Sequence, residues 1–460
     1  MKFVGREKEL ESLEKEYAKE RASFIVIYGR RRIGKTRLIE EFLRNKKEQI
    51  YYLAADEKDF QQIKELKLLI GAFFNDNFLV EHEFREWKDL FSYLEKIWPR
   101  NKKLVFVIDE TTFIIKNNHS FPSYLQQFWD KFLSKTQTTL ILSGSLVGLM
   151  LKEVGRRTSE MPLEELKLND VYKFLDRNIE ETLCFFSIFG GVPKYLELID
   201  ASFKNFSNEM FDKKSFFFRE GIYLMTEEFK DISTYSNILK AISEGNTKIN
   251  EISNYAGIET KKISAYLDIL ENIGFIEGLA PVTKEKSRFR GRIYLIKDSF
   301  LEFWFRFINK NRSLIELDKK DELIGDIYNE INSFIGEKFE KTCSQFLILS
   351  KVFHFTKIGK QWGKMPNIPK DKNQYEIDIV ALNEQTKEIL FAECKWKENV
   401  DAENILQELR KKSTYVDWKN NKYYAVFAKS FKKKFKDRNV MLFDLKDIEK
   451  ELKGKVTTSQ

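Results

Sequence analysis

Apolar positions near the start of the chain fall in short continuous runs. Three runs of apolar and β-branched residues cover 24–28, 104–108 and 138–142, and each is followed by a glycine or by polar side chains. Such runs are typical of strands buried on both faces of a parallel sheet. An amphipathic helix is expected to begin near Lys35, so the pattern predicts an α/β domain.

Two other patterns follow further along the chain. From Tyr235 the apolar residues return at helical spacing in three short groups, with turn signals at Gly245 and Gly257. Between Tyr375 and Trp396 they alternate with a period of two, which predicts two strands joined by the turn "NEQT". The change of pattern indicates three domains.

The loop after the first run has the spacing of a phosphate-binding loop. Gly29 is followed by four residues and then by Gly34, Lys35 and Thr36, which matches G-x-x-x-x-G-K-[ST] between a strand and a helix. In such a loop the backbone N–H groups face a phosphate, the lysine reaches the β- and γ-phosphates, and the threonine hydroxyl binds Mg²⁺. We expect ATP and Mg²⁺ as cofactors, and the expected nucleotide contacts in the loop are Gly29, Arg30, Arg31, Arg32, Ile33, Gly34, Lys35, Thr36 and Arg37.

The second and third runs end in side chains that complete the expected nucleotide site. Asp109 is expected to bind Mg²⁺ through water, and Glu110 to polarise the attacking water beside the γ-phosphate. Ser143 and Ser145 follow the third run, at the carboxyl edge where parallel sheets bind ligands. Either one of these hydroxyls senses the γ-phosphate, or the segment forms a simple turn.

Several short motifs in this order carry a family resemblance: "FVGREKEL", "GRRRIGKT", "VFVIDE", "LILSGS", "GRRT" and "GGVPKYL". Residues 1–230 resemble the archaeal ATPase family, which belongs to the AAA+ and STAND branch of P-loop ATPases. The resemblance implies that Val4 and Gly5 lie near the adenine and that Arg156 or Arg157 acts as an arginine finger. It also implies that Pro193 and Tyr195 belong to a helical lid. A homo-oligomer formed through the ATPase domain is a further expectation.

One departure from the family falls beside the expected catalytic acid. Where the acids are commonly followed by a Phe-Pro-Tyr-like stretch, this chain has Thr111, Thr112 and Phe113. The segment that positions the attacking water therefore differs from the family pattern.

The middle of the chain has the pattern of a winged helix. Three short helices are followed by two strand-like pieces that bracket "APVTKEKSRFRGR", which we interpret as a β-wing. We expect duplex DNA as the partner, because cations lie where phosphates would run; the alternative is a protein-docking or structural module. The expected DNA contacts are Lys261 and Lys262 on the third helix and Lys284, Lys286, Arg288, Arg290 and Arg292 on the wing.

The two alternating strands near the end carry charged side chains at a spacing used by nucleases. Asp378 lies on the first strand, and Glu393 and Lys395 share one face of the second. Asp378 and Glu393 would hold Mg²⁺ together with the Cys394 carbonyl, and Lys395 would orient or deprotonate a water aimed at phosphorus. A preceding helix offers Glu340 as a further acid, with Glu337 as the second choice.

This arrangement resembles the PD-(D/E)xK nucleases. Together with "KIGKQWGK" and "EIDIVA", the segment also resembles the domain of unknown function that commonly follows the archaeal ATPase module. Ile377 stands where the nucleases usually have a proline before the first acid. The alternative is an inactive nuclease fold used for binding, because the same spacing arises by chance in basic β-rich chains.

Composition adds a location for the positive charge. The net charge of the chain is +8, and residues 331–460 hold 26 Lys and Arg against 18 Asp and Glu, a difference of +8, so the excess lies in the last domain. Three dispersed cysteines and three histidines form no zinc-like spacing. The first residues lack the apolar core of a signal peptide and no run is long enough to span a membrane, so we expect a cytoplasmic protein without a membrane partner.

The sequence therefore predicts a P-loop ATPase domain with a parallel sheet and helical lid at 1–230 and a winged helix at 231–310. A linker at 311–330 and a restriction-endonuclease-like α/β domain at 331–460 follow. The predicted function is an ATP-binding and hydrolysing protein that binds duplex or branched DNA and cleaves it with Mg²⁺. The alternative is a STAND-like regulatory or scaffold ATPase whose last domain only binds partners.

Overall fold

The computed structural model describes residues 3–145, 150, 158–286, 289, 291–366, 369 and 373–454, excepting the side chains of 207, 208 and 320–326. The chain divides into two compact units. The first comprises Met1–Glu165 and Val192–Tyr195, and the second comprises Leu166–Gly191 and Leu196–Gln460. This division separates residues 166–191 from the ATPase sheet, whereas the sequence pattern grouped them with it; the predicted domain boundaries stay predictions.

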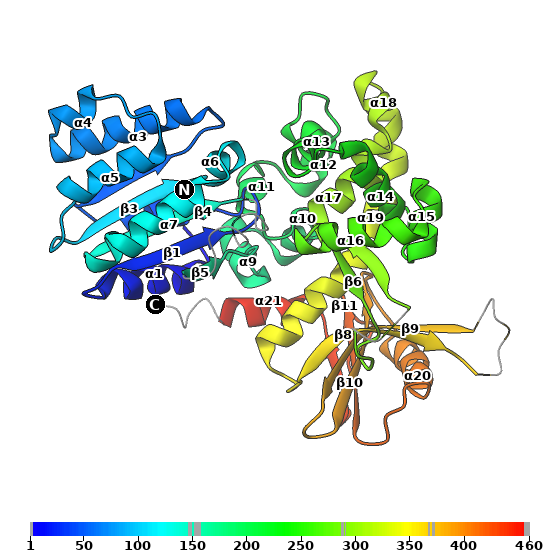
Figure 1. Cartoon of the computed structure of the whole chain (residues 1–460). Coiled ribbons are helices and arrows are strands. Elements are labelled where there is room, and N and C mark those ends of the chain that lie inside the picture. The colour runs from blue at the N-terminus through cyan, green and yellow to red at the C-terminus, as the bar shows by residue number, and fades with distance from the viewer. Residues whose placement is uncertain are drawn as a thin grey trace. The chain divides into compact units, whose positions relative to one another are not determined.

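The first unit is built on a five-stranded sheet with the order β2-β3-β4-β1-β5, in which every neighbouring pair is parallel (Figure 1). Its strands are β1 (Ser23–Tyr28), β2 (Gln49–Leu53), β3 (Leu104–Asp109), β4 (Thr138–Gly144) and β5 (Ser159–Pro162). The three predicted strands are present as β1, β3 and β4. The two strands that the pattern missed lie at the edges of the sheet.

Helices cover both faces of this sheet, as expected for a doubly covered parallel sheet. Alternation along β1 places Phe24 and Val26 in the core cluster on one face, and Ile25 and Ile27 in the cluster on the other. The helices of this unit are α1 (Glu7–Ala18), α2 (Lys35–Leu43), α3 (Asp59–Phe74), α4 (Asn77–Glu81), α5 (Trp87–Ile97), α6 (Thr112–Asn117) and α7 (Phe121–Lys131). The predicted helix at Lys35 is α2.

The second unit begins with lid helices that pack on its own C-terminal part. They are α9 (Leu168–Leu175), α10 (Ile179–Phe189), the end of α11 (Pro193–Glu197), α12 (Phe203–Met210) and α13 (Phe216–Glu228). The Tyr172 hydroxyl donates to Glu449 at 2.8 Å, and Lys429 is ion-paired with Glu180 at 2.5 Å. These contacts explain why residues 166–191 cluster with the second unit.

The winged helix is present as three helices and a two-stranded antiparallel sheet. Its elements are α14 (Ile232–Ser243), α15 (Ile249–Ala256), α16 (Thr260–Asn272), β6 (Ile276–Leu279) and β7 (Ile293–Ile296). Ile238, Leu267 and Leu270 from the helices are fully buried, and these residues carry the helical spacing of the sequence.

The segment predicted as a linker is largely helical. It contains α18 (Arg312–Glu316) and the start of α19 (Lys320–Ser350), and it follows α17 (Ser299–Phe303) and a π-helical segment at Trp304–Asn309. The polar composition of residues 311–330 predicts a linker without regular secondary structure. Lysine and glutamate are, however, good helix formers, so a polar stretch that packs one face can continue as a helix; Ile315 is buried here.

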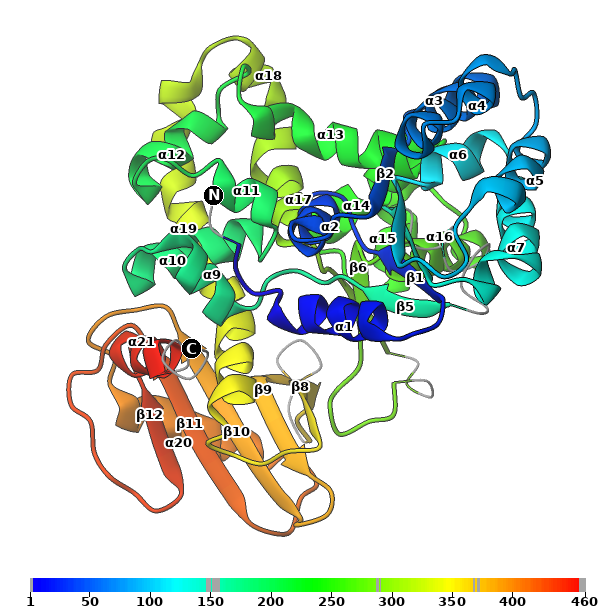
Figure 2. The ribbon, with the colours of Figure 1, turned by 90° about the vertical axis from the view of Figure 1, so that its left-hand side faces the viewer.

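The C-terminal sheet has five strands in the order β12-β11-β10-β9-β8 (Figure 2). Strands β8 to β10 are antiparallel neighbours, and β10 to β12 are parallel. Helix α19 packs Phe346 against Phe427, while Leu409 of α20 joins the core cluster on the opposite face. The elements are β8 (Lys357–Lys364), β9 (Gln374–Asn383), β10 (Glu388–Lys395), α20 (Ala402–Ser413), β11 (Lys422–Ala428), β12 (Val440–Phe443) and α21 (Leu445–Gly454).

Among the described residues, no helix has the length and apolar character needed to cross a membrane.

Candidate active sites

The phosphate loop places its lysine over its own backbone. Lys35 is only 4% exposed, and its ammonium group donates to the carbonyl oxygens of Gly29 and Arg30 at 3.0 Å each. Gly34 precedes the first residue of α2 with φ of 94°, a left-handed conformation that glycine adopts without steric cost. The loop therefore delivers the lysine and the helix N-terminus to one place, as phosphate binding requires.

Gly29 is required by a close backbone approach. A Cβ atom at this position would lie 2.4 Å from the carbonyl oxygen of Leu163, which follows β5. Leu163 is held there because its N–H donates to the carbonyl of Tyr28 at 2.7 Å. Any side chain at Gly29 would push the start of the loop away from the sheet.

Asp109 is the centre of a hydrogen-bond network at the end of β3. Its carboxylate is fully buried and accepts from the hydroxyls of Thr36 at 2.8 Å, Tyr51 at 2.7 Å, and Ser143. Burial, followed by the nearby Asp109 charge, raises the pKa of Tyr51, so this phenol stays a hydrogen-bond donor. The two residues expected to share Mg²⁺, Thr36 and Asp109, are thus in direct contact. Tyr51 was not anticipated.

Glu110 sits in an uncommon backbone conformation next to this network. Its φ is 50°, which costs a non-glycine residue about 1 to 2 kcal/mol. The Ser145 hydroxyl donates to its carboxylate at 3.4 Å, and the N–H of Thr111 donates to the carbonyl of Ser143 at 2.8 Å. The strained residue is held by β4, so its carboxylate is positioned by the neighbouring strand.

Thr111 and Thr112, where the chain departs from the family pattern, are buried. The Thr111 hydroxyl donates to the carbonyl of Ile108 at 2.7 Å. This hydrogen bond from Thr111 closes the turn between β3 and α6.

Several of the expected loop contacts have protein partners. Arg30 is ion-paired with Glu165 at 3.0 Å, Arg37 with Glu40 at 3.1 Å, and Arg31 lies over the ring of Phe113 at 5.5 Å. Their role in nucleotide contact stays a prediction. Arg157 and its alternative Arg156 lie outside the described residues.

The segment before α1 reaches the loop through a residue that the sequence did not indicate. Val4 is buried and Gly5 has a φ of 74°. The following residue, Arg6, donates to the carbonyls of Ile33 at 3.0 Å and Glu164 at 2.6 Å. Pro193 lies beside Gly34, 3.9 Å from where a Cβ would be. Arg6 and Pro193 therefore border the phosphate loop, and the role of Val4 and Gly5 near the adenine stays a prediction.

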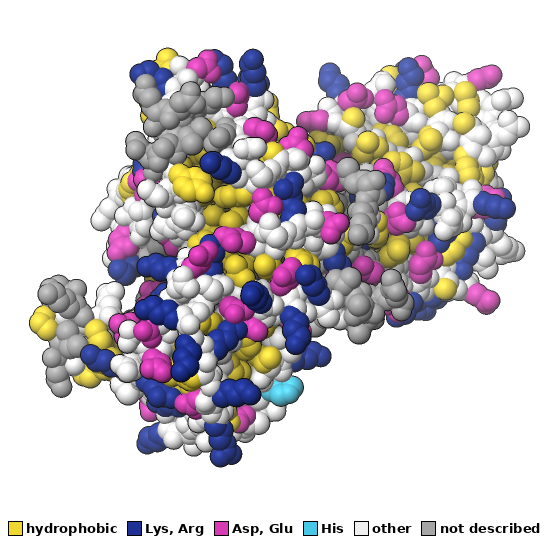
Figure 3. All heavy atoms as spheres, turned by 180° about the vertical axis from the view of Figure 1, so that it is seen from behind, with side chains coloured by type: hydrophobic (Ala, Val, Ile, Leu, Met, Phe, Trp, Pro, Cys, Tyr) yellow, Lys and Arg dark blue, Asp and Glu magenta, His cyan; other side chains and the backbone are white. Residues whose placement is uncertain are grey.

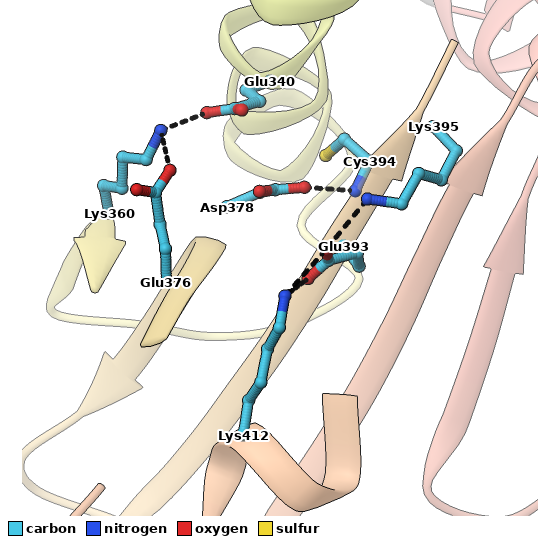
Figure 4. Close-up of polar contacts among 8 residues, drawn as sticks. All are labelled: Glu340, Lys360, Glu376, Asp378, Glu393, Cys394, Lys395 and Lys412. Atoms are coloured by element: carbon cyan, nitrogen blue, oxygen red, sulfur yellow. Dashed lines mark hydrogen bonds and ion pairs between the residues drawn. The ribbon is translucent and has the colours of Figure 1, made fainter. Parts of the chain in front are cut away.

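The charged side chains of the C-terminal domain gather around β9 and β10 (Figure 4). Asp378 lies between Glu340 of α19 and Glu393 of β10, and its carboxylate accepts from the backbone N–H of Cys394 at 2.8 Å. The Lys395 ammonium contacts Glu393 at 2.9 Å. Glu337, the second choice, pairs instead with Arg306 at 2.7 Å.

Burial and neighbouring carboxylates raise the pKa values of two acids in this cluster. Burial, with Asp378 beside it, raises the pKa of Glu340 from 4.5 to about 7. Burial and the charge of Glu393 also raise the pKa of Asp378. Burial alone would lower the pKa of Lys395, but its hydrogen bond to Glu393 raises it. A cation bound nearby would favour the charged form of these carboxylates and lower their pKa values.

Two lysines that the sequence did not indicate complete the cluster. Lys360 of β8 bridges Glu340 at 3.1 Å and Glu376 at 2.6 Å. Lys412 of α20 contacts both carboxylate oxygens of Glu393, at 3.1 and 3.3 Å. The predicted acids are therefore drawn toward separate ammonium groups.

The predicted metal ligands do not form a ready ligand set. Among the described residues, no three or more His, Cys, Asp or Glu side chains are grouped so that they could hold one metal ion. Glu340 and Glu393 lean toward Lys360 and Lys412, and Asp378 accepts from a backbone amide. Metal binding by Asp378 and Glu393 stays a prediction that requires these contacts to rearrange.

The wing is anchored on the edge of the C-terminal sheet. The N–H of Val282 donates to the carbonyl of Lys360 at 3.0 Å, and the hydroxyl of Thr283 donates to the buried Gln361 at 3.0 Å. The Val282 side chain packs against the core of that sheet. The wing thus contacts the strand that supplies Lys360.

Some of the predicted DNA contacts have partners on the protein. Lys286 pairs with Glu271 at 2.7 Å, and Lys262 pairs with Glu259 at 3.4 Å while staying 68% exposed. Arg292 lies over the ring of Tyr294 at 5.8 Å. Lys261 and Lys284 are exposed, whereas Arg288 and Arg290 lie outside the described residues.

The fold and the loop define a class: a P-loop ATPase with a parallel sheet. Residues 3–199 match the ATPase domain predominantly from Archaea, residues 233–277 match the bacterial regulatory proteins of the arsR family, and residues 304–405 match archaeal and bacterial proteins of unknown function. The chain is 34% identical over 464 residues to uncharacterized protein MJECL04 of Methanocaldococcus jannaschii, covering 97% of this chain and 100% of the relative. The chain therefore belongs to the same family as this relative, and its residues 3–199 match the ATPase domain predominantly from Archaea.

Other similarities are shorter or more distant. A stretch of 45 residues is 56% identical to uncharacterized ATP-binding protein MJ0423 of M. jannaschii, covering 10% of this chain and 76% of that protein. The Walker-type ATPase PABY2304 of Pyrococcus abyssi has a TM-score of 0.47 at 18% identity, covering 66% of this chain and 96% of that one. Cdc6p of Pyrobaculum aerophilum has a TM-score of 0.32 at 15% identity, with coverage of 69% and 94%.

The predictions of an archaeal ATPase domain, a helix-turn-helix module and the C-terminal domain of unknown function are confirmed by these matches. The nuclease resemblance of that last domain stays a prediction.

Proposed function

We propose that the protein binds ATP with Mg²⁺ at the end of its parallel sheet and hydrolyses it. The contact between the Thr36 hydroxyl and Asp109 at 2.8 Å is the main support, because these two groups act together on Mg²⁺ in P-loop ATPases. The donors fit the ion, since hydroxyl and carboxylate oxygens are the ligands that Mg²⁺ prefers. When bound, Mg²⁺ would neutralise charge on the β- and γ-phosphates.

The residues of the chain then have separate tasks. Lys35 leaves its two loop carbonyls for the phosphates, and the N–H groups at the start of α2 face the same anion. Glu110 accepts a proton from, or orients, the attacking water. Ser145, which donates to Glu110, keeps that carboxylate at the strand end.

Two substitutions test this proposal. Lys35→Ala is expected to abolish binding of a fluorescent ATP analogue, because a buried phosphate ligand is lost. Glu110→Gln is expected to keep binding while slowing phosphate release by about 100-fold or more, the usual contribution of general-base catalysis. Lys102→Ala, at a lysine whose side chain is 57% exposed, is the control. Equal affinity for the analogue in wild type and Lys35→Ala would refute the proposal.

We further propose that the winged helix binds duplex DNA. The support is a helix-turn-helix module with Lys261 exposed on α16 and a basic C-terminal domain beside it. Figure 3 shows Lys and Arg side chains gathered over this domain, in its lower left part. Phosphates are the natural partner of such a surface.

As a second function, we propose that the cluster around Asp378 cleaves DNA with Mg²⁺. The support is the convergence of Glu340, Asp378, Glu393 and Lys395 from a helix and two strands (Figure 4), together with the raised pKa of two of the acids. Asp378 and Glu393 would hold Mg²⁺, which would polarise the phosphodiester. Lys395 would orient the water that attacks phosphorus.

The cleavage proposal requires an assay on plasmid, linear and branched DNA with Mg²⁺, with and without ATP. Asp378→Ala and Lys395→Ala should each stop cleavage and leave ATP hydrolysis unchanged. DNA affinity should stay level or rise in Asp378→Ala, because a negative charge is removed. If wild-type protein cuts none of these substrates, the last domain is a binding module and the protein is a regulatory or scaffold ATPase.

A further inference from the structure

A basic hollow lies on the second unit, outside both sites above. It has a volume of about 540 Å³ and lies between the start of α13 and α18, which Figures 1 and 2 show as neighbours. Such a volume falls in the range of about 300 to 1,000 Å³ found for ligand sites. It is lined by Lys213, Lys214, Ser215, Phe216, Phe218, Arg219, Tyr223, Arg312 and Glu316.

Positive charge dominates this lining, with four cations against a single carboxylate. Two of the cations are neutralised on the protein: Arg312 pairs with Glu316 at 2.8 Å, and Lys213 pairs with Asp318 at 2.5 Å. Lys214 and Arg219 are exposed, and neither has an ion-pair partner among the residues described. Two cations are therefore available for an anionic ligand.

Aromatic rings stand beside these cations. Phe216 is 38% exposed and Tyr223 is 50% exposed, although both occur in a helix whose inner face buries Phe217 and Leu224. Phe216, Arg219 and Tyr223 follow a spacing of three and four residues, so they form one stripe along α13. Rings alternating with cations are the pattern by which proteins hold unpaired bases and the phosphates between them.

We infer that this hollow binds single-stranded nucleic acid, with bases stacked on Phe216 and Tyr223 and phosphates bound by Lys214 and Arg219. A duplex does not fit this chemistry, because its bases are already stacked and their faces are covered. Separated strands are the ligand whose exposed π-faces and phosphates both find partners here.

The test uses the full-length chain with a fluorescein-labelled oligothymidine, and with a duplex of equal length, both in EDTA. Tyr223→Ala is expected to weaken oligothymidine binding on the order of tenfold, and Tyr223→Phe to retain it, because the phenyl ring still stacks. Arg219→Gln should lower the slope of log affinity against log salt by about 0.7. Duplex affinity and ATP hydrolysis should not change in these variants.

Matched controls are an exposed ring and an exposed cation elsewhere, Phe78→Ala at 52% exposure and Lys446→Gln on α21. Both should bind oligothymidine like the wild type. Unchanged binding in Tyr223→Ala and Arg219→Gln would overturn the inference. Competition by thymidine monophosphate at the same concentration of nucleotide units would also overturn it, because the hollow would then be a site for free nucleotides.

Discussion

The partly buried carboxyl of Glu340, whose side chain is 27% exposed, allows a quantitative prediction. Its pKa is about 7 in the folded chain against 4.5 for an ordinary glutamate. Between these values the folded state holds a proton that the unfolded state has released, so the free energy of unfolding falls as the pH rises. From about pH 5.5 to about pH 8 the loss is about 2 kcal/mol, since one pKa unit corresponds to about 1.4 kcal/mol.

Glu340→Gln removes this dependence because the amide does not titrate. Relative to wild type, the variant should gain about 2 kcal/mol between the two pH values, which is about 30-fold in the opening equilibrium of the C-terminal sheet. Hydrogen exchange of peptides from β9 and β10 in the full chain, in EDTA, measures this equilibrium locally. Comparing the same peptides in both proteins cancels the intrinsic dependence of exchange on pH.

The control is Glu384→Gln, whose carboxylate is 54% exposed and pairs with an exposed lysine. Its effect should be below about 1 kcal/mol, as for other surface ion pairs, and similar at both pH values. Added Mg²⁺ should reduce the loss of wild-type stability between the two pH values, because a nearby cation favours the charged carboxyl and brings its folded-state pKa closer to 4.5. A ratio of exchange between wild type and Glu340→Gln that is the same at both pH values would refute the reasoning.

Three other predictions follow from single contacts. Tyr51→Phe removes a hydrogen bond to Asp109 and should slow ATP hydrolysis about fivefold, corresponding to about 1 kcal/mol; an unchanged rate in a phosphate-release assay would contradict a role for the phenol. Lys261→Gln combined with Lys262→Gln should lower the slope of log duplex affinity against log salt by about 1.8. A slope equal to that of the wild type would show that the winged helix connects domains and does not bind DNA through these lysines. Thr283→Val removes the hydroxyl that donates to Gln361 and should speed hydrogen exchange in β8 about fivefold, whereas unaltered exchange would show that the wing is not anchored through it.

The nucleotide site was largely predictable because its residues are contiguous or end a strand. Tyr51 was not, because β2 carries two adjacent tyrosines whose side chains point to opposite faces. The register that pairs Leu53 with Asp109 decides which one faces the site. Tyr52 turns the other way and donates to Gln62 of α3. The sequence alone does not show which residues of β2 and β3 pair.

The C-terminal site was predictable only in part. Spacing placed Glu393 and Lys395 on one face of a strand, and the structure brings them to Asp378 and Glu340. Lys360 and Lys412 come from β8 and α20, and a lysine on a strand edge or helix surface usually faces solvent. Their presence follows from tertiary packing, including the wing that holds β8, and not from local sequence.

The two sites hold their acids by different means, and this difference bears on how each would accept a cation. Asp109 is surrounded by three hydroxyl donors, which can rotate toward a ligand without moving any charge. Glu393 and Glu340 instead contact ammonium groups, so Mg²⁺ must displace or repel a positive charge before it binds. The strand that carries Lys360 is tied to the wing through Val282 and Thr283. Anything that moves the wing would therefore move Lys360, the lysine that contacts Glu340. The wing is thus the part of this unit through which bound DNA would alter the charge of the cluster.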